Sequence, residues 1–292
     1  SALLVNFKSI DFIVRADRVH GRAVITTVPE IPNLEIVNQV KLSNQPCSGN
    51  AVQLYMNVPD LAVPERVAFS GSLPTSCQAI QLPRSVMRAP AYAFGTFKSL
   101  WQQWGGSIEG GYRVTPKPAG ARLLLTWHSR ELGELIRPLN KWSNNVMTRM
   151  LLYTIGEKPN RTPITRAEGA EALLAHLRKR GLDTTGLEID NGSGLSRTAR
   201  VSARFMVALM RHAWHQPTMP EYLASLSIVG RDGTTRKRFR TGEESGRMHL
   251  KSGSIANVSA VDGYVHTPSG RTFVVSMMIN HPHANWGAGT AV

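Results

Sequence analysis

Short runs of β-branched residues, separated by turn residues, fill about the first 85 positions of the chain. Two such runs lie at 9–15 and 22–28, and the intervening Ala-Asp-Arg-Val-His-Gly segment has turn character, so together they predict a β-hairpin. Further short strands are expected at 34–42, 51–58 and 66–70, with prolines and glycines marking the connections. This part of the chain is therefore predicted to be β-rich.

A helical pattern of apolar residues appears at 91–106, where the predicted helix ends at a glycine pair. The residues at helical spacing, which we expect to pack in the core, are Phe94, Phe97, Leu100, Trp101 and Trp104. From about Ser129 the pattern indicates longer helices. Thr165 and Glu168 form a capping box at the start of one helix, and Ser202 is expected to cap another.

The C-terminal region returns to strand character. Residues 260–265 and 271–279 read as two strands, and Thr267-Pro-Ser-Gly270 between them predicts a hairpin turn. No internal repeat or low-complexity segment interrupts the pattern.

Composition and charge narrow the classes of protein to consider. Hydrophobic residues make up 42% of the 292, enough for a sizeable core. No run approaches the length of a transmembrane helix, and Ser1–Phe7 lacks the features of a signal peptide. The net charge of +14 favours contact with a polyanion, but no nucleic-acid-reading motif accompanies it, so nucleic-acid binding is not favoured. The densest basic cluster is Arg236–Arg240.

The two cysteines, Cys47 and Cys77, lack the spacing of a structural zinc site. Counting alone leaves two readings open, a pair of buried free thiols or one disulfide. His281-Pro-His283 has no acidic or cysteine partners at supporting spacing, so no metal site is predicted.

Three short motifs carry the candidate chemistry. They are Asn140-Lys-Trp-Ser-Asn-Asn145, Asp190-Asn-Gly-Ser-Gly-Leu-Ser-Arg197 and Lys251-Ser-Gly-Ser254. Taken singly, the first reads as a polar helix start, the second as a glycine-rich loop and the third as a chance match. Taken in order, Ser143-x-Asn145 followed by Lys251-Ser252-Gly253 is typical of acyl-serine enzymes of the β-lactamase and penicillin-binding type.

On these motifs the chain resembles the D-alanyl-D-alanine carboxypeptidase/endopeptidase family, the class C low-molecular-mass penicillin-binding proteins. Further similarities lie at Leu4–Phe7, Gly230–Gly233 and Val258–Tyr264. Cys47 and Cys77 also fall where this family often has a pair, and export would favour a bridge between them. The resemblance runs nearly end to end.

The resemblance implies a role for each motif residue. Ser143 would relay protons and help protonate the leaving group, and Asn145 would orient the substrate amide. Lys251 would line the cleft and help bind the terminal carboxylate. Substrate-binding positions would be Ser252, which stands where the family usually has threonine, with Gly253 and Ser254.

One departure from the family pattern is the absence of Ser-x-x-Lys, the motif that carries the nucleophile. No lysine of the chain has serine three residues before it, and the most similar segment is Thr234-Thr-Arg-Lys237, with threonine in the place of serine. The family places its nucleophile upstream, ahead of inserted accessory domains. We therefore expect the chain to be a fragment at both ends, without turnover or a covalent penicillin adduct.

The resemblance implies an α+β fold, with a penicillin-binding/β-lactamase-like antiparallel sheet and flanking helices. Residues 1–125 would be the remainder of inserted β-rich accessory domains, and 126–292 an incomplete catalytic domain. The intact protein would be periplasmic and need no cofactor, and it would act on peptidoglycan stem peptides and react with β-lactams. It could form a homodimer. The alternative is a catalytically silent peptidoglycan-binding homologue.

Overall fold

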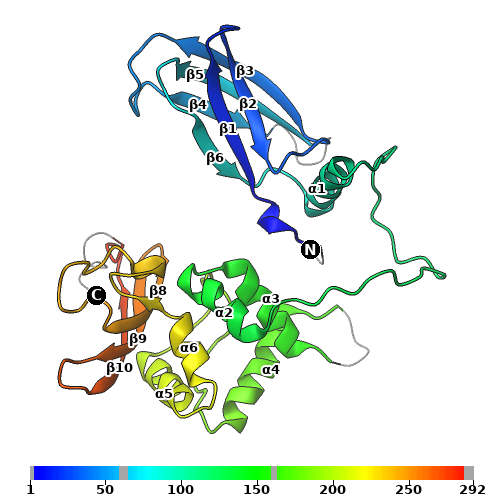
Figure 1. The fold of residues 1–292 in the computed structure, drawn as a ribbon. Coiled ribbons are helices and arrows are strands. Elements are labelled where there is room, and N and C mark those ends of the chain that lie inside the picture. Colours follow the sequence, from blue (N-terminus) through cyan, green and yellow to red (C-terminus); the bar gives the residue numbers. More distant parts are fainter. Residues whose placement is uncertain (1–2, 59–64, 159–162, 286–292) are drawn as a thin grey trace. The chain divides into compact units, whose positions relative to one another are not determined.

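The computed structural model describes residues 3–58, 65–158 and 163–285 (Figure 1). The chain divides into two compact units, Ser1–Leu124 and Leu125–Val292. Between the last helix of the first unit and the first helix of the second, residues 107–131 form no helix or strand and are largely exposed. Within the described ranges, no helix combines the length and the apolar character needed to cross a bilayer.

In its described residues, the first unit is built from two three-stranded sheets and one α-helix (Figure 1). One sheet has the order β2-β1-β6 and is antiparallel, whereas the other has the order β3-β5-β4 with β3 and β5 parallel. The elements are a 3-10 helix at Asn6–Lys8, β1 (Ile10–Asp17), β2 (Arg22–Val28), β3 (Glu35–Ser43), β4 (Gln53–Asn57), β5 (Arg66–Pro74), β6 (Ile80–Arg84) and α1 (Ala89–Gln103). The hairpin and the further strands predicted from the pattern are thus confirmed, while β6 was not predicted.

The core of the first unit lies between its two sheets. Phe12 of β1 and Phe69 of β5 are fully buried, and their ring centroids are 5.1 Å apart. Other buried members of this core include Ile10, Val14 and Leu73. Burial of such side chains contributes roughly 1.5–3 kcal/mol each, so this layer supplies much of the stability of the unit.

Helix α1 corrects one expectation. The residues expected to pack in the core do not form its packing face, since Phe97 and Trp101 are 57% and 44% exposed. The helix packs instead through Tyr92, which is fully buried and donates to the Ser9 carbonyl, and through Gly95. A Cβ at Gly95 would lie 2.0 Å from the Asn33 side-chain oxygen, so the close approach there selects the buried face.

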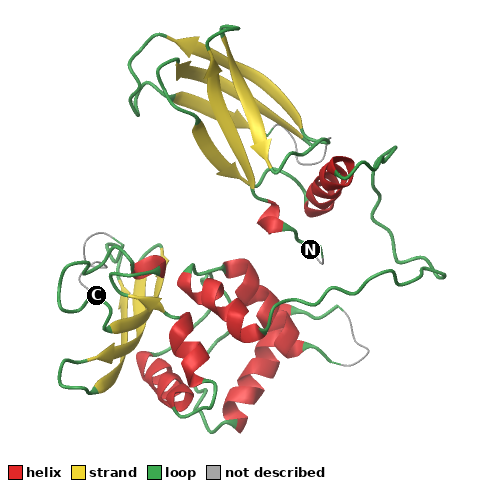
Figure 2. Cartoon of the chain, in the orientation of Figure 1, coloured by secondary structure: helices red, strands yellow, loops and turns green. Residues whose placement is uncertain are grey.

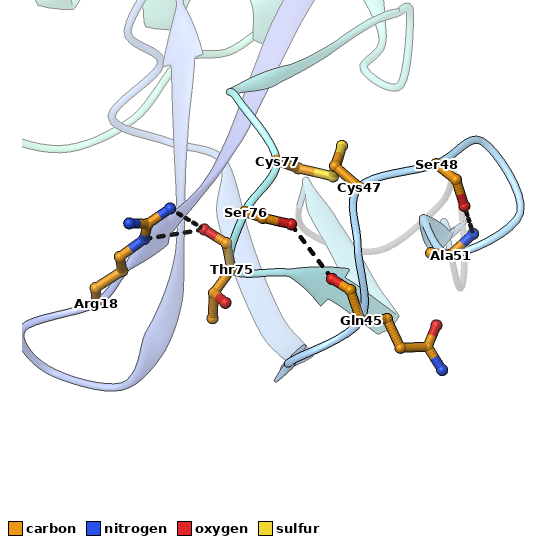
Figure 3. Close-up of a disulfide and its surroundings, with 8 residues drawn as sticks. All are labelled: Arg18, Gln45, Cys47, Ser48, Ala51, Thr75, Ser76 and Cys77. Carbon is orange, nitrogen blue, oxygen red and sulfur yellow. Dashed lines mark hydrogen bonds between the residues drawn. A yellow bond between two sulfur atoms is a disulfide. The ribbon is translucent and has the colours of Figure 1, made fainter.

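A disulfide joins Cys47 and Cys77, which follow β3 and β5 respectively (Figure 3). The cysteine count had left open two free thiols or one disulfide, and the structure shows the disulfide. Near it, the Ser76 hydroxyl donates to the Gln45 carbonyl at 3.2 Å, and Arg18 donates twice to the Thr75 carbonyl. The bridge therefore lies where two loop segments are already held together.

The second unit combines helices with an antiparallel sheet of order β10-β9-β8-β7 (Figure 2). With the first unit, it makes the chain an α+β protein. Its elements are α2 (Leu132–Lys141), α3 (Asn145–Gly156), α4 (Arg166–Lys179), α5 (Ala203–Trp214), α6 (Met219–Ser225), β7 (Ser227–Ile228), a 3-10 helix at Gly233–Thr235, β8 (Met248–Ile255), β9 (Val258–His266) and β10 (Thr272–Asn280). The predicted capping box of Thr165 and Glu168 and the Ser202 cap are both present.

Helices α5 and α6 cover one face of this sheet. Tyr264 of β9 is fully buried against Met210 and Leu226, and its hydroxyl donates to the Met210 carbonyl at 2.7 Å. Helices α3 and α4 meet at Gly156 and Gly169, where a Cβ on Gly156 would lie 2.8 Å from the Gly169 Cα. These contacts hold the helices that frame the residues described next.

Candidate active site

The turn between α2 and α3 carries Ser143. Its φ of 53° lies in the left-handed region, which residues other than glycine rarely adopt. Asn144 follows as the cap of α3, with its side-chain oxygen accepting the amides of Val146 and Met147 at 3.2 and 3.1 Å. The cap uses Asn144, so the Ser143 side chain is left available for other contacts.

The end of α2 is tied to the segment around β7. Lys141 donates to the Asp232 carboxylate at 2.6 Å and to the Leu226 carbonyl at 2.9 Å, and its side chain is only 18% exposed. Asn140 donates to the Ser225 hydroxyl at 2.7 Å. These bonds fix the position of the α2–α3 turn relative to the sheet.

Lys251 of β8 reaches this turn. Its ammonium donates to the Ser143 hydroxyl, and also to the Ser252 carbonyl at 2.7 Å. Burial lowers the pKa of Lys251, and the negative charge of Asp262 acts in the opposite sense. The structure thus brings together two of the residues singled out in the sequence, although 108 positions separate them.

A row of hydroxyl groups continues from Lys251. The Ser252 hydroxyl lies 3.0 Å from that of Thr234, and the Thr234 amide donates to the fully buried Ser227 hydroxyl at 3.2 Å. Gly233 makes this arrangement possible, because its φ is +58° and a Cβ there would lie 2.8 Å from the Lys141 carbonyl oxygen. The 3-10 helix therefore holds Thr234 beside the Lys-Ser-Gly motif.

The other predicted site residues lie nearby in the chain but make fewer contacts. Asn145 is the first residue of α3 and is half-buried, and the described hydrogen bonds do not join its side chain to Ser143 or Lys251. Gly253 and Ser254 lie on the exposed end of β8, where the Ser254 hydroxyl accepts a hydrogen bond from Asn285 at 2.6 Å.

The edge of β8 that faces β7 is largely open. The two residues of β7 pair only with His249 and Leu250, so in the described part of the chain no strand pairs with β8 on this side from Lys251 onward. An open strand edge can accept an extended peptide through main-chain hydrogen bonds. This edge begins at the lysine that contacts Ser143.

The glycine-rich loop after α4 is ordered by its own side chains. Asn191 donates to the Leu195 carbonyl at 3.0 Å and accepts the Ser193 amide at 3.0 Å. Arg197 then donates to the Ala256 carbonyl at 2.8 Å, which links this loop to the turn between β8 and β9. The second sequence motif is therefore connected to the strand that carries the third.

An aromatic residue and a cation lie next to Ser143. Trp142 is 58% exposed, and the Arg236 guanidinium lies 5.4 Å from its ring centroid. Arg236 also donates to the Gly233 carbonyl at 3.0 Å. Together with Lys251, this gives the region around the turn a positive character suited to carboxylate groups.

Two residues of this region, Thr234 and Asp262, are not among the site residues predicted from sequence. Both lie in or beside segments noted for their family resemblance, Gly230–Gly233 and Val258–Tyr264, and Thr234 also begins the run that comes nearest to Ser-x-x-Lys. Asp262 lies opposite Lys251 in the sheet register. Among the described residues, no three His, Cys, Asp or Glu side chains cluster closely enough to hold a metal ion.

A model of the D-Ala-D-Ala carboxypeptidase 3 (S13) family matches residues 2–289. The D-alanyl-D-alanine carboxypeptidase of Actinomadura sp. (strain R39) is 31% identical over 255 residues, which are 84% of this chain and 46% of that protein. A carboxypeptidase of Mycobacterium tuberculosis (strain ATCC 25618 / H37Rv) is 28% identical over 178 residues, 59% of this chain and 38% of that protein. The chain thus spans about half the length, or less, of these curated relatives.

Solved structures agree on the fold. Penicillin binding protein 4 (dacB) from Haemophilus influenzae gives a TM-score of 0.74 at 21% identity, with 96% of this chain and 62% of that chain covered. The same protein complexed with a β-lactam gives 0.71 at 20% identity, with 96% and 65% covered. The family match over nearly the whole chain settles the classification: the chain belongs to the D-Ala-D-Ala carboxypeptidase 3 (S13) family, among the low-molecular-mass penicillin-binding proteins.

Proposed function

We propose that this chain supplies the substrate-binding half of a serine-type D-Ala-D-Ala carboxypeptidase/endopeptidase that acts on peptidoglycan. The observation that carries the proposal is the hydrogen bond from the Lys251 ammonium to the Ser143 hydroxyl, which joins the first and third of the three sequence motifs. Neither residue needs this contact for its own element, since Asn144 caps α3 and β8 is held by β9. Such a pair provides both a proton relay and a positive charge at a half-buried position.

Each predicted residue has a chemical task in this proposal. Lys251 and the Ser252 hydroxyl bind the carboxylate of the terminal D-alanine, and Thr234 holds the Ser252 hydroxyl from the other side. Asn145 orients the substrate amide. The open main-chain edge at Gly253 and Ser254 pairs with the extended peptide and contributes to the oxyanion site.

Ser143 serves the proton transfer of the reaction. In the acyl-serine mechanism, the nucleophilic oxygen bonds to the carbonyl carbon before the terminal D-alanine while the peptide C–N bond breaks. The departing nitrogen needs a proton, and Ser143 relays it. Burial lowers the pKa of Lys251 beside it, so this ammonium gives up a proton more readily than an exposed lysine does. Water then hydrolyses the ester and releases the shortened peptide.

The 292 residues contain no Ser-x-x-Lys, so we expect them alone to form no covalent penicillin adduct and to show no turnover. The same absence favours the second candidate, a catalytically silent peptidoglycan-binding homologue. Reading the gene upstream of Ser1 separates the two, because the active protein requires Ser-x-x-Lys there and the silent one does not.

We propose that 126–292 form part of the penicillin-recognising domain and that 1–125 derive from inserted β-rich accessory domains. The relative from Haemophilus influenzae is described in complex with a β-lactam, which supports β-lactams as ligands of the intact protein. We further propose a periplasmic location, supported by the Cys47–Cys77 disulfide because such bonds persist in oxidising compartments. We also propose that the intact protein forms a homodimer.

The direct test is non-covalent binding of a diacyl-L-Lys-D-Ala-D-Ala peptide to this chain, followed by chemical-shift changes at Ser143 and Lys251. We expect binding that is lost in Lys251→Ala and kept in Lys179→Ala, which removes an equal charge at the end of α4. The peptide ending in L-Ala-L-Ala is the ligand control. Equal binding of both peptides, or an unchanged affinity in Lys251→Ala, would refute the proposed binding site.

Fluorescent penicillin gives the complementary result. We expect no labelled band from the purified chain, and a labelled band would contradict our assignment of the nucleophile to a Ser-x-x-Lys motif that is absent from these residues.

A further inference from the structure

A row of polar residues crosses the sheet at Lys251. Lys251 of β8 pairs with Asp262 of β9, and Asp262 pairs with Ser276 of β10. Directly opposed residues of antiparallel strands project from the same face of a sheet. The next row on this face holds Tyr264, which packs against α5 and α6, so Asp262 is placed on the helix-covered side.

The cost of burying a carboxylate in this position must be offset by hydrogen bonds or by a positive charge nearby. The Ser276 hydroxyl donates to Asp262 at 2.5 Å, which satisfies one acceptor oxygen. Among the groups with a shifted pKa, Lys251 on β8 and Tyr222 on α6 interact electrostatically with Asp262. Tyr222 is neutral at physiological pH, because burial raises its pKa to about 12 and the charge of Asp262 adds to the effect. Lys251 is therefore the cationic counterpart of Asp262.

The Lys251 ammonium, conversely, is a partly buried positive charge that needs a negative charge nearby. The hydrogen bonds described for it go to two neutral oxygens, those of the Ser143 side chain and the Ser252 main chain. Neutral acceptors offset the burial of a cation only in part, and a carboxylate on the facing strand supplies the remaining attraction.

We propose that Asp262 is a positioning residue that acts through Lys251, keeping this side chain charged and directed at Ser143. The inference rests on the proposed function in so far as Lys251 binds the substrate carboxylate. The Asp262 carboxylate contacts no substrate in this scheme. It maintains the charge of the residue that does.

The first test measures the titration of Lys251 directly. Competitive labelling with acetic anhydride over a range of pH, read by peptide mass spectrometry, reports the fraction of neutral amine at each lysine. In Asp262→Asn we expect the pKa of Lys251 to fall by about one unit, so labelling at pH 8 rises roughly tenfold. Asp183→Asn removes an equal charge from an exposed loop and should change labelling less than about twofold.

An unchanged or slower labelling of Lys251 in folded Asp262→Asn would overturn the inference, because a purely structural aspartate leaves that titration unmoved. A second measurement needs no substitution. In the wild-type chain, the carbon-13 shift of the Asp262 carboxyl should show an additional inflection at the pH where Lys251 loses its proton, because the two groups interact. The absence of this inflection would also overturn it. Failure of the D-Ala-D-Ala peptide to bind would refute the proposed function. The two titration results do not depend on peptide binding and would still test the role of Asp262.

Discussion

Removing the Cys47–Cys77 disulfide should destabilise the first unit and leave the second unaffected. The bridge closes a loop with a sequence separation of 30 residues. Cys47 is exposed and Cys77 only partly packed, so the double variant Cys47→Ala/Cys77→Ala loses little buried surface. The dominant effect is the greater chain entropy of the unfolded state, about 12 cal/mol/K, or about 3.6 kcal/mol at 25 °C.

Hydrogen exchange measured by mass spectrometry is suited to this prediction because it reports each unit separately. Peptides from β1 and β5 should lose about 3.6 kcal/mol of protection in the double variant, whereas peptides from β9 should not change. Ser76→Ala is the matched control, since it removes the hydrogen bond to Gln45 in the same loops and should cost less than about 1 kcal/mol. A loss below about 1 kcal/mol in the β1 and β5 peptides, or an equal loss in β9, would refute the reasoning.

Three further predictions concern the second unit and are read by urea unfolding. Asp232→Ala leaves the mostly buried Lys141 ammonium without its carboxylate. Because Asp232 is 37% exposed, we expect the free energy of unfolding to fall by only about 1–2 kcal/mol. An unchanged free energy would show that the pair does not tie α2 to the sheet. Gly169→Ala should destabilise by about 1–3 kcal/mol despite its better helix propensity, because the new Cβ would lie 2.4 Å from the Leu152 carbonyl oxygen; a stabilised variant would contradict the close α3–α4 packing. Burial raises the pKa of Asp262 above its ordinary 3.8, so the native state binds this proton more tightly and stability should fall as pH rises from 3.8 through the raised value. Asp262→Asn should lack this slope, and an identical slope in the variant would argue against the raised pKa.

Features determined by a few neighbouring residues were predictable from sequence. The β1–β2 hairpin follows from two β-branched runs around a turn, and the α4 start follows from Thr165 and Glu168, which lie within one helical turn of each other. Motif order and resemblance singled out Ser143 and Lys251, whereas no local rule predicts the hydrogen bond that joins them across 108 positions.

Features determined by distant contacts were not predictable. The periodicity of α1 gave a helix but pointed to the wrong face, since the close approach of Asn33 to Gly95 decides which side is buried. Asp262 reads as one polar residue in an apolar strand until the register places it opposite Lys251. In both cases the missing information is which segments far apart in sequence become neighbours.

The left-handed backbone at Ser143 makes Ser143 and Ser252 unequal in which residues could replace them. Threonine carries the same hydroxyl, but its branched Cβ is poorly tolerated at a φ of 53°, so position 143 admits serine and discriminates against threonine. Ser252 lies in the extended strand β8, where a branched Cβ is favoured. Two chemically identical side chains therefore face opposite constraints on their replacement, imposed by the backbone and not by the reaction.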